Sequence, residues 1–321
     1  MQSPQRHTTT YDGNTIDGNA IAILGNIHGD IHFPDRSGDS EQQRCLRDLR
    51  VTDPREDRAR IEGDKDRLLR DCYAWILDDV SFQRWRTQDE SRLLWIKGDP
   101  GKGKTMMTMG VIAELSRPES LYVVVPKKRR RMDDPEPLLS FFFCQNTVPA
   151  LNNAVSVLRG LIYMLVKQRD SLLRYVQEKH RIAGRQLFKG HNAVYSLQSI
   201  LSNILNDASL PPTYLLIDAL DECTSSLSEL LQVIMDASLR RQLRVKWLVT
   251  SRNILEIKRY LQPNSLGVKV SLEVKASYIA RAVAVFVNSK VQSLATIKKY
   301  NLWLQAEVQQ QLCDKAEGTF L

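Results

Sequence analysis

The strongest constraint on the fold of this chain is an apolar stretch that runs directly into a glycine-rich loop. Residues 93–97 read Leu-Leu-Trp-Ile-Lys, and the residues that follow match the phosphate-binding pattern G-x-x-x-x-G-K-T. Gly98, Gly101 and Gly103 are expected to allow backbone angles that a Cβ would forbid, so that successive N–H groups turn inward around a polyphosphate. A helix predicted over 106–115 would point its positive end at the same anion.

The loop also carries the charge and the hydroxyl that a nucleotide site needs. Lys104 would place an ammonium group beside the outer phosphates, and the Thr105 hydroxyl can ligate Mg²⁺. The predicted cofactors are therefore ATP or GTP together with Mg²⁺. The residues expected to contact the nucleotide are Gly98, Asp99, Pro100, Gly101, Lys102, Gly103, Lys104, Thr105 and Met106.

A second apolar stretch, residues 214–217, ends in the acidic residue Asp218. Uninterrupted apolar stretches of this kind are typical of parallel strands that are covered on both faces. Asp218 could hold Mg²⁺ through water, and Asp221 and Glu222, just beyond, could orient or deprotonate an attacking water. On its own, the segment could also be a core strand followed by a polar turn. The phosphate-binding pattern upstream favours the metal-binding and catalytic interpretation.

A third apolar stretch, residues 245–249, leads to Thr250, Ser251 and Arg252. Because open α/β sheets bind ligands at the carboxyl ends of their strands, Arg252 is expected at the same edge as the phosphate loop. There its guanidinium could pair with a terminal phosphate. The alternative is a surface arginine at the end of a strand.

The rest of the chain alternates between strand and helix patterns. This alternation predicts an α/β fold, a parallel P-loop NTPase sheet covered by helices and followed by a helical region. Further strands are predicted at 138–144 and 268–272, and helices at 64–80, 154–166, 172–180, 194–205, 227–239 and beyond 276.

The ordered set GDPGKGKT, TYLLIDALDEC and VKWLVTSRN resembles the NACHT domain of fungal NOD-like receptors, which belong to the signal-transducing ATPase class. Segments 45–62, 138–145 and 152–166 also look like parts of these proteins, so the resemblance covers about residues 45–321. It implies that the strand bearing Arg252 lies between the other two motif strands. It also implies a molecular switch with slow or no hydrolysis, whose nucleotide state decides whether the protein oligomerises and signals in non-self recognition or regulated cell death.

Composition and the resemblance together predict four regions: a low-complexity tail with Gly-Asn repeats (1–40), a helical lead-in (41–90), the NACHT domain (91–274) and a C-terminal helical region (275–321). Relatives continue into a winged-helix region and repeats, for which this sequence shows no counterpart. The expected partners are a nucleoside triphosphate and either further copies of the chain or a downstream effector protein.

Charge, hydropathy and cysteines limit the other function classes. Much of the +8 net charge lies in residues 127–131, between prolines and acidic residues, which predicts an exposed loop; an import signal or an acidic-lipid contact stays open. No aromatic residues are interleaved with this run, so nucleic acid is not an expected partner. We expect no membrane span and no secretory signal. The five scattered cysteines suit a reducing cytoplasm.

Residues 11–33 repeat Gly-Asn with isoleucines between, which suits short strands joined by tight turns and also the stacking of identical chains. A flexible tail or a single hairpin is the simpler interpretation. Two alternative functions follow: a passive nucleotide-binding scaffold whose N-terminal segment templates amyloid-like assembly, or an active ATPase.

Overall fold

A computed structural model describes strand residues 9–11 and 14–16 and residues 40–64, 69–117, 136–190, 192–240, 242–262 and 267–320. The chain divides into two units, Met1–Asp39 and Ser40–Leu321. In the first unit, β1 (Thr9–Tyr11) and β2 (Asn14–Ile16) pair antiparallel. The rest of the Gly-Asn stretch within 11–33 and the basic run 127–131 lie outside the described residues.

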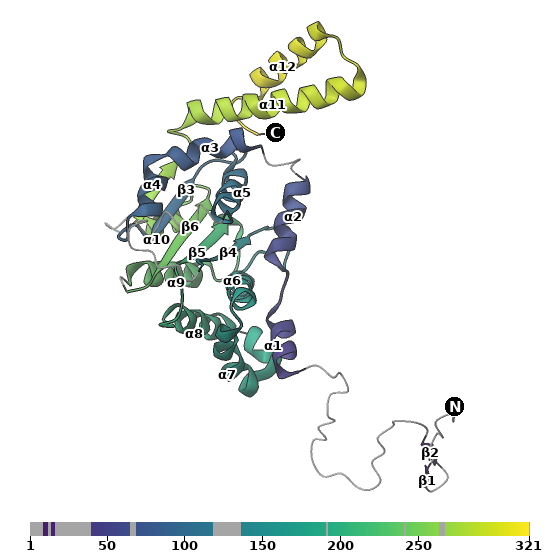
Figure 1. The fold of residues 1–321 in the computed structure, drawn as a ribbon, viewed down its shortest axis with the longest axis vertical. Coiled ribbons are helices and arrows are strands. Elements are labelled where there is room, and N and C mark those ends of the chain that lie inside the picture. The colour runs from purple at the N-terminus through teal and green to yellow at the C-terminus, as the bar shows by residue number, and fades with distance from the viewer. Residues whose placement is uncertain are drawn as a thin grey trace. The chain divides into compact units, whose positions relative to one another are not determined.

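The second unit is built on a five-stranded parallel sheet with the order β4-β5-β6-β3-β7 (Figure 1). The predicted α/β fold is therefore confirmed, and the arginine-bearing strand β6 lies between β5 and β3, as the family resemblance implied. The strands are β3 (Leu93–Lys97), β4 (Leu138–Phe143), β5 (Thr213–Asp218), β6 (Val245–Ser251) and β7 (Gly267–Ser271).

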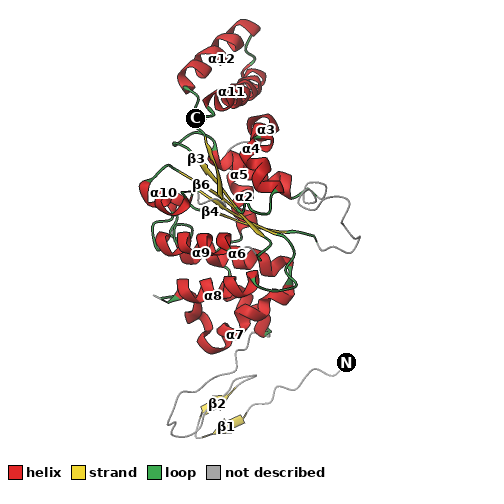
Figure 2. Cartoon of the chain, turned by 90° about the vertical axis from the view of Figure 1, so that its left-hand side faces the viewer, coloured by secondary structure: helices red, strands yellow, loops and turns green. Residues whose placement is uncertain are grey.

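Helices cover both faces of this sheet, with α5 on one side and α6 and α9 on the other (Figure 2). The helices are α1 (Glu41–Leu49), α2 (Pro54–Asp64), α3 (Arg70–Asp78), α4 (Val80–Thr87), α5 (Lys104–Leu115), α6 (Ala154–Gln168), α7 (Leu173–Ala183), α8 (Ala193–Leu205), α9 (Leu227–Leu239), α10 (Leu255–Leu261), α11 (Ala276–Lys298) and α12 (Leu302–Ala316).

Alternate residues of each central strand enter different cores, because successive side chains of a strand point to opposite faces. In β3, Trp95 packs into the core formed with α6, α8 and α9, whereas Leu94 and Ile96 pack into the core formed with α3, α4 and α5. Every residue of β4, β5 and β6 is buried. This double covering explains why these strands read as continuous apolar stretches instead of alternating ones.

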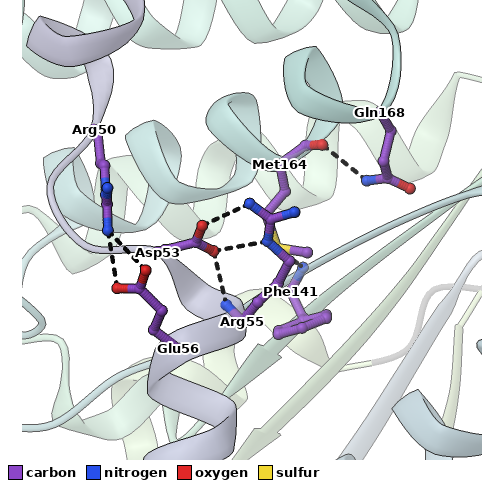
Figure 3. A network of polar contacts seen from close by, with 7 residues as sticks. All are labelled: Arg50, Asp53, Arg55, Glu56, Phe141, Met164 and Gln168. Atoms are coloured by element: carbon purple, nitrogen blue, oxygen red, sulfur yellow. Dashed lines mark hydrogen bonds and ion pairs between the residues drawn. The ribbon is translucent and has the colours of Figure 1, made fainter.

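The turn between α1 and α2 is held by its own charged side chains (Figure 3). Asp53 accepts hydrogen bonds from the backbone N–H of Arg55 at 3.0 Å and from its guanidinium Nε at 2.9 Å. The hydrogen bonds from the Arg55 side chain lower the pKa of the Asp53 carboxyl below its ordinary value. Pro54 is the first residue of α2, a position whose backbone N–H makes no hydrogen bond within the helix, so proline loses nothing there. Arg50 forms an ion pair with Glu56 at 2.8 Å.

A helix is confirmed within the stretch predicted over 64–80, but it is shorter than predicted, because the chain breaks at Asp79. Helix α3 begins only at Arg70, and Asp79 has an extended backbone between α3 and α4. Its carboxylate accepts from the backbone N–H of Ser81 at 2.9 Å and pairs with Lys275 at 2.7 Å. Asp79 therefore caps a second helix, a role that an aspartate in an otherwise helical pattern does not reveal.

Lys246 is buried at the start of β6, at the edge of the sheet opposite the phosphate loop. Its ammonium donates to the carbonyl oxygens of Gln88 at 2.7 Å and Ser91 at 3.2 Å, beyond the end of α4. Burial lowers the pKa of Lys246 from 10.5 to about 8. Between these two values the unfolded chain binds more protons than the folded one, so this group makes the fold more stable as pH rises.

We therefore expect the free energy of unfolding of the wild type, relative to that of Lys246→Met, to increase by up to about 3 kcal/mol from pH 8 to 10.5. Urea denaturation at several pH values measures this difference. Lys269→Met, at an exposed position of β7, is the matched control and should show no such rise. A wild-type-to-variant difference that does not change with pH would contradict the assignment.

Candidate nucleotide-binding site

The glycine-rich loop between β3 and α5 has the backbone that the sequence predicts at two of its three glycines. Gly101 and Gly103 have φ values of +76° and +80°, and Gly103 is the N-cap of α5. Gly98 differs, because its φ is not positive. A Cβ there would lie 2.9 Å from the Leu272 side chain. Gly98 is therefore needed for close packing and not for an unusual backbone angle.

Lys104 is folded back over its own loop. Its ammonium donates to the carbonyl oxygens of Gly98 at 2.7 Å and Asp99 at 3.0 Å. Burial lowers the pKa of Lys104, and the carboxylates of Asp221 and Asp218 act in the opposite direction. The loop thus holds one partly buried cation at the N-terminus of α5, where the first backbone N–H groups have no partner within the helix.

The carboxylate of Asp218, at the end of β5, ties together the strands and the helix behind the loop. Its Oδ1 accepts hydrogen bonds from the Thr108 hydroxyl at 2.8 Å and the Thr250 hydroxyl at 2.7 Å. Thr250 in turn accepts from the backbone N–H of Ala219 at 2.9 Å. The Asp218 residue is only 2% exposed. The motifs did not identify Thr108 or Thr250 as site residues, although Thr108 is a hydroxyl residue with apolar neighbours on both sides in α5.

Asp221 and Arg252 face each other across the ends of β5 and β6. Asp221 accepts from the backbone N–H of Arg252 at 2.8 Å and from its guanidinium Nε at 2.6 Å. This hydrogen bond raises the pKa of Arg252. Because both carboxylate oxygens are engaged, Asp221 is better suited to orienting Arg252 than to deprotonating water.

Glu222 points in a different direction from Asp221. Ala219, with φ of +53°, turns the chain sharply after β5 into the 3-10 turn Leu220–Glu222. Glu222 then accepts from the backbone N–H of Asn146, beyond β4, at 3.0 Å. A non-glycine residue in this left-handed conformation carries a strain cost that the surrounding structure must offset. The turn thereby directs Asp221 toward the end of β6 and Glu222 toward the end of β4.

These elements surround a pocket of about 790 Å³ at the carboxyl ends of the strands. Its size lies within the range of small-molecule and cofactor sites, and its amide groups, ammonium and carboxylates fit a triphosphate bound with Mg²⁺. The lining residues are Pro100, Gly101, Gly103, Lys104, Thr105, Met106, Ala219, Asp221, Glu222, Arg252, Phe286, Lys290 and Phe320.

Four of the predicted site residues lie beside this pocket but not in its lining. Gly98 and Asp218 pack behind it. The backbone N–H of Asp99 donates to Glu273 at 2.8 Å, and the Lys102 ammonium donates to the carbonyl oxygen of Gly318 at 3.0 Å. Lys102 therefore connects the loop to the end of the chain and does not face the pocket.

The C-terminal region supplies a pocket wall that the motifs did not predict. The backbone N–H of Phe320 donates to the Gly101 carbonyl at 2.7 Å, and its ring lies 2.6 Å from where a Cβ on Gly103 would sit. The rings of Phe286 and Phe320 are 5.7 Å apart, and the Lys290 ammonium lies 5.3 Å from the Phe286 ring. These residues are about two hundred positions from the loop, so no local pattern connects them with it.

The hydrogen bonds around Asp218 give a test of its structural role. Asp218→Ala removes the acceptor of the buried Thr250 hydroxyl and leaves the Thr108 hydroxyl only the Lys104 carbonyl at 3.2 Å. We expect it to lower the free energy of unfolding by roughly 2–4 kcal/mol. Asp218→Asn keeps an oxygen in place and should cost clearly less. Urea denaturation compares the two, and equal losses would show that the hydroxyl contacts do not stabilise the fold.

Comparison with known proteins adds to this geometry. The family model described as "Nephrocystin 3, N-terminal" matches residues 71–252, which contain the phosphate loop, Asp218 and Arg252. The chain is also similar to the vegetative incompatibility protein HET-E-1 of Podospora anserina, with 41% identity over 330 aligned residues. That alignment covers 99% of this chain and 23% of the relative, so the chain spans about a quarter of the relative's length.

Proposed function

The chain belongs to the nephrocystin 3 N-terminal family, in agreement with the predicted NOD-like-receptor type, and we propose that it is the nucleotide-binding module of a signalling switch. In this proposal the pocket takes ATP or GTP with Mg²⁺, and the bound nucleotide controls self-association or contact with an effector. The similarity to a vegetative incompatibility protein supports a role in non-self recognition.

The observation that carries the proposal is the loop at the N-terminus of α5. Two left-handed glycines, a partly buried lysine and the first-turn amides of a helix, which have no partner within that helix, converge on one pocket. Each of these features favours an anion, and together they match the backbone and charge that a polyphosphate requires. An ordinary surface loop has no need of a partly buried ammonium group that donates to the carbonyl oxygens of the loop itself.

The remaining residues divide into three roles. Thr105 would ligate Mg²⁺, with Asp218 acting on the metal through water. Arg252, oriented by Asp221, would contact the terminal phosphate and so distinguish triphosphate from diphosphate. Glu222 would orient an attacking water if hydrolysis occurs. When bound, Mg²⁺ supplies neutralising charge beside the outer phosphates.

The proposed organisation assigns the pocket to two regions of the chain. The NACHT domain, residues 91–274, supplies the phosphate loop and the acidic strand ends. The C-terminal helical region, 275–321, supplies Phe286, Lys290 and Phe320. A pocket walled by both regions could couple nucleotide state to the position of α11, which is the coupling that a switch needs.

Lys104→Ala tests nucleotide binding directly. Because the phosphate charge loses its ammonium partner, we expect affinity for triphosphate, measured by calorimetry with Mg²⁺ present, to fall about 10- to 100-fold or more. Lys97→Ala removes the same charge at the end of β3, where the ammonium lies 5.8 Å from the Trp95 ring, and should bind as the wild type does. Unchanged affinity in Lys104→Ala would defeat the proposal.

The mass of the chain in solution distinguishes a nucleotide-dependent switch from a passive nucleotide-binding scaffold. We expect light scattering after size exclusion to give a larger mass with a non-hydrolysable triphosphate than with ADP or without nucleotide, and no such change in Lys104→Ala. Binding with identical mass in all three states would leave a nucleotide-binding scaffold, with assembly driven from elsewhere in the chain.

A further inference from the structure

The α11–α12 hairpin ends in a tip that combines exposed apolar side chains with clustered positive charge. Figure 1 shows the far end of α11 and its connection to α12 extending beyond α3, on which α11 packs. Four large apolar side chains at this end face solvent: Leu294 is 37% exposed, Ile297 74%, Leu302 86% and Trp303 73%. We call these four residues, with Lys298 and Lys299, the hairpin tip.

The local structure fixes this arrangement. Lys299 has φ of +56° and ends α11. Asn301 caps α12 by accepting from the backbone N–H of Leu304 at 2.8 Å. Leu302 and Trp303 are therefore the first two residues of α12, where both side chains are exposed. Leu294 and Ile297 lie three residues apart on α11 and so share a face.

The two charged side chains of the hairpin tip itself, Lys298 and Lys299, are both cations. The next acid along the chain is Glu307, an exposed residue one helical turn after Trp303 on α12. Lys298 and Lys299 stand directly between the two pairs of exposed apolar residues, and both are exposed. A surface that contacts this tip must therefore accept apolar side chains and supply negative charge over the same small area.

We propose that the hairpin tip is a docking surface for an anionic lipid membrane, which it contacts peripherally. Leu302 and Ile297 would enter the boundary between headgroups and acyl chains, and Trp303 would lie at the headgroup level, where its amphipathic ring is favoured. Lys298 and Lys299 would lie among anionic headgroups. With so few anchoring residues, the contact is reversible and depends on salt.

The proposal does not require a spanning segment. No helix in the described part of the chain has the length and apolar character to cross a bilayer. It is also independent of nucleotide binding, because none of the tip residues lines the nucleotide pocket.

The first experiment is cosedimentation of the full chain with vesicles. We expect binding to phosphatidylcholine vesicles that contain phosphatidylserine, little binding to phosphatidylcholine alone, and release when NaCl is raised from about 0.1 to about 0.5 M. The double variant Leu302→Ser/Trp303→Ser and the double variant Lys298→Glu/Lys299→Glu should each bind about tenfold more weakly or worse. Ile182→Ser, at an 89% exposed position of α7, is the matched control and should bind as the wild type does.

Trp303 provides a second measurement at the site itself. Of the five tryptophans, Trp85, Trp95 and Trp247 are buried and Trp75 is half-buried. Blue-shifted emission and quenching by brominated lipid should therefore come from Trp303 and disappear in Trp303→Phe. Replacement of the basic run 127–131 by serine should leave this quenching in place. That result would show that the hairpin tip, and not the basic run, contacts the lipid.

Three results would overturn the proposal. One is wild-type vesicle binding by Leu302→Ser/Trp303→Ser, and another is unchanged Trp303 emission on anionic vesicles. The third is a variant that changes the mass of the chain in solution without changing vesicle binding, because the tip would then be a contact between copies. Circular dichroism and nucleotide affinity of the variants verify that each one is folded.

Discussion

Parallel pairing of β3 with β6 is the constraint on which the rest of the site depends. The backbone N–H of Gly98, directly after β3, donates to the carbonyl oxygen of Ser251 at the end of β6, at 3.2 Å. That register places the phosphate loop and Arg252 at the same edge of the sheet. With β5 on the far side of β6, Asp218 and the turn that follows it reach this edge as well. A shift of either strand along its neighbour would separate the cation, the acids and the arginine.

The sequence predicted the parts of this arrangement that depend on local patterns. Continuous apolar stretches revealed β3, β5 and β6, and the residues at their carboxyl ends included Arg252 and Asp218. Local sequence patterns could not predict which residues contact these side chains. The hydroxyl contacts of Asp218 with Thr108 and Thr250 depend on how α5 and β6 meet β5 in space. The wall formed by Phe286 and Phe320 depends on how the end of the chain returns to the loop.

Two predictions, the backbone angle of Gly98 and the extent of the helix over 64–80, differ from the structure because of contacts that the sequence pattern does not show. Gly98 was expected to adopt an unusual backbone angle, yet what excludes a side chain there is Leu272, the residue directly after β7. The helix predicted over 64–80 breaks at Asp79, whose carboxylate caps α4 and pairs with Lys275. The contact of Gly98 with Leu272 and the ion pair of Asp79 with Lys275 join residues far apart in the sequence, whereas the cap of Asp79 on Ser81 is local. Periodicity within a segment cannot report such contacts.

Helix α11 connects the two surfaces that we propose for this molecule. Phe286 and Lys290 line the nucleotide pocket, and Ile297 lies about 10 Å further along the same helix axis, at the hairpin tip. The same helix packs against α3, whose following residue Asp79 is tied to Lys275 beside the start of α11. One continuous element therefore contributes to the nucleotide pocket at one position and to the hairpin tip at another.

The most direct test of the central claim is a crystal structure of the chain with a non-hydrolysable triphosphate and Mg²⁺. We expect the phosphates to lie against the amides of the loop at 101–105. The Lys104 ammonium should move from the Gly98 and Asp99 carbonyls onto the outer phosphates, and Arg252 should face the terminal phosphate. A pocket that stays empty at saturating nucleotide, or a nucleotide bound elsewhere, would contradict the claim.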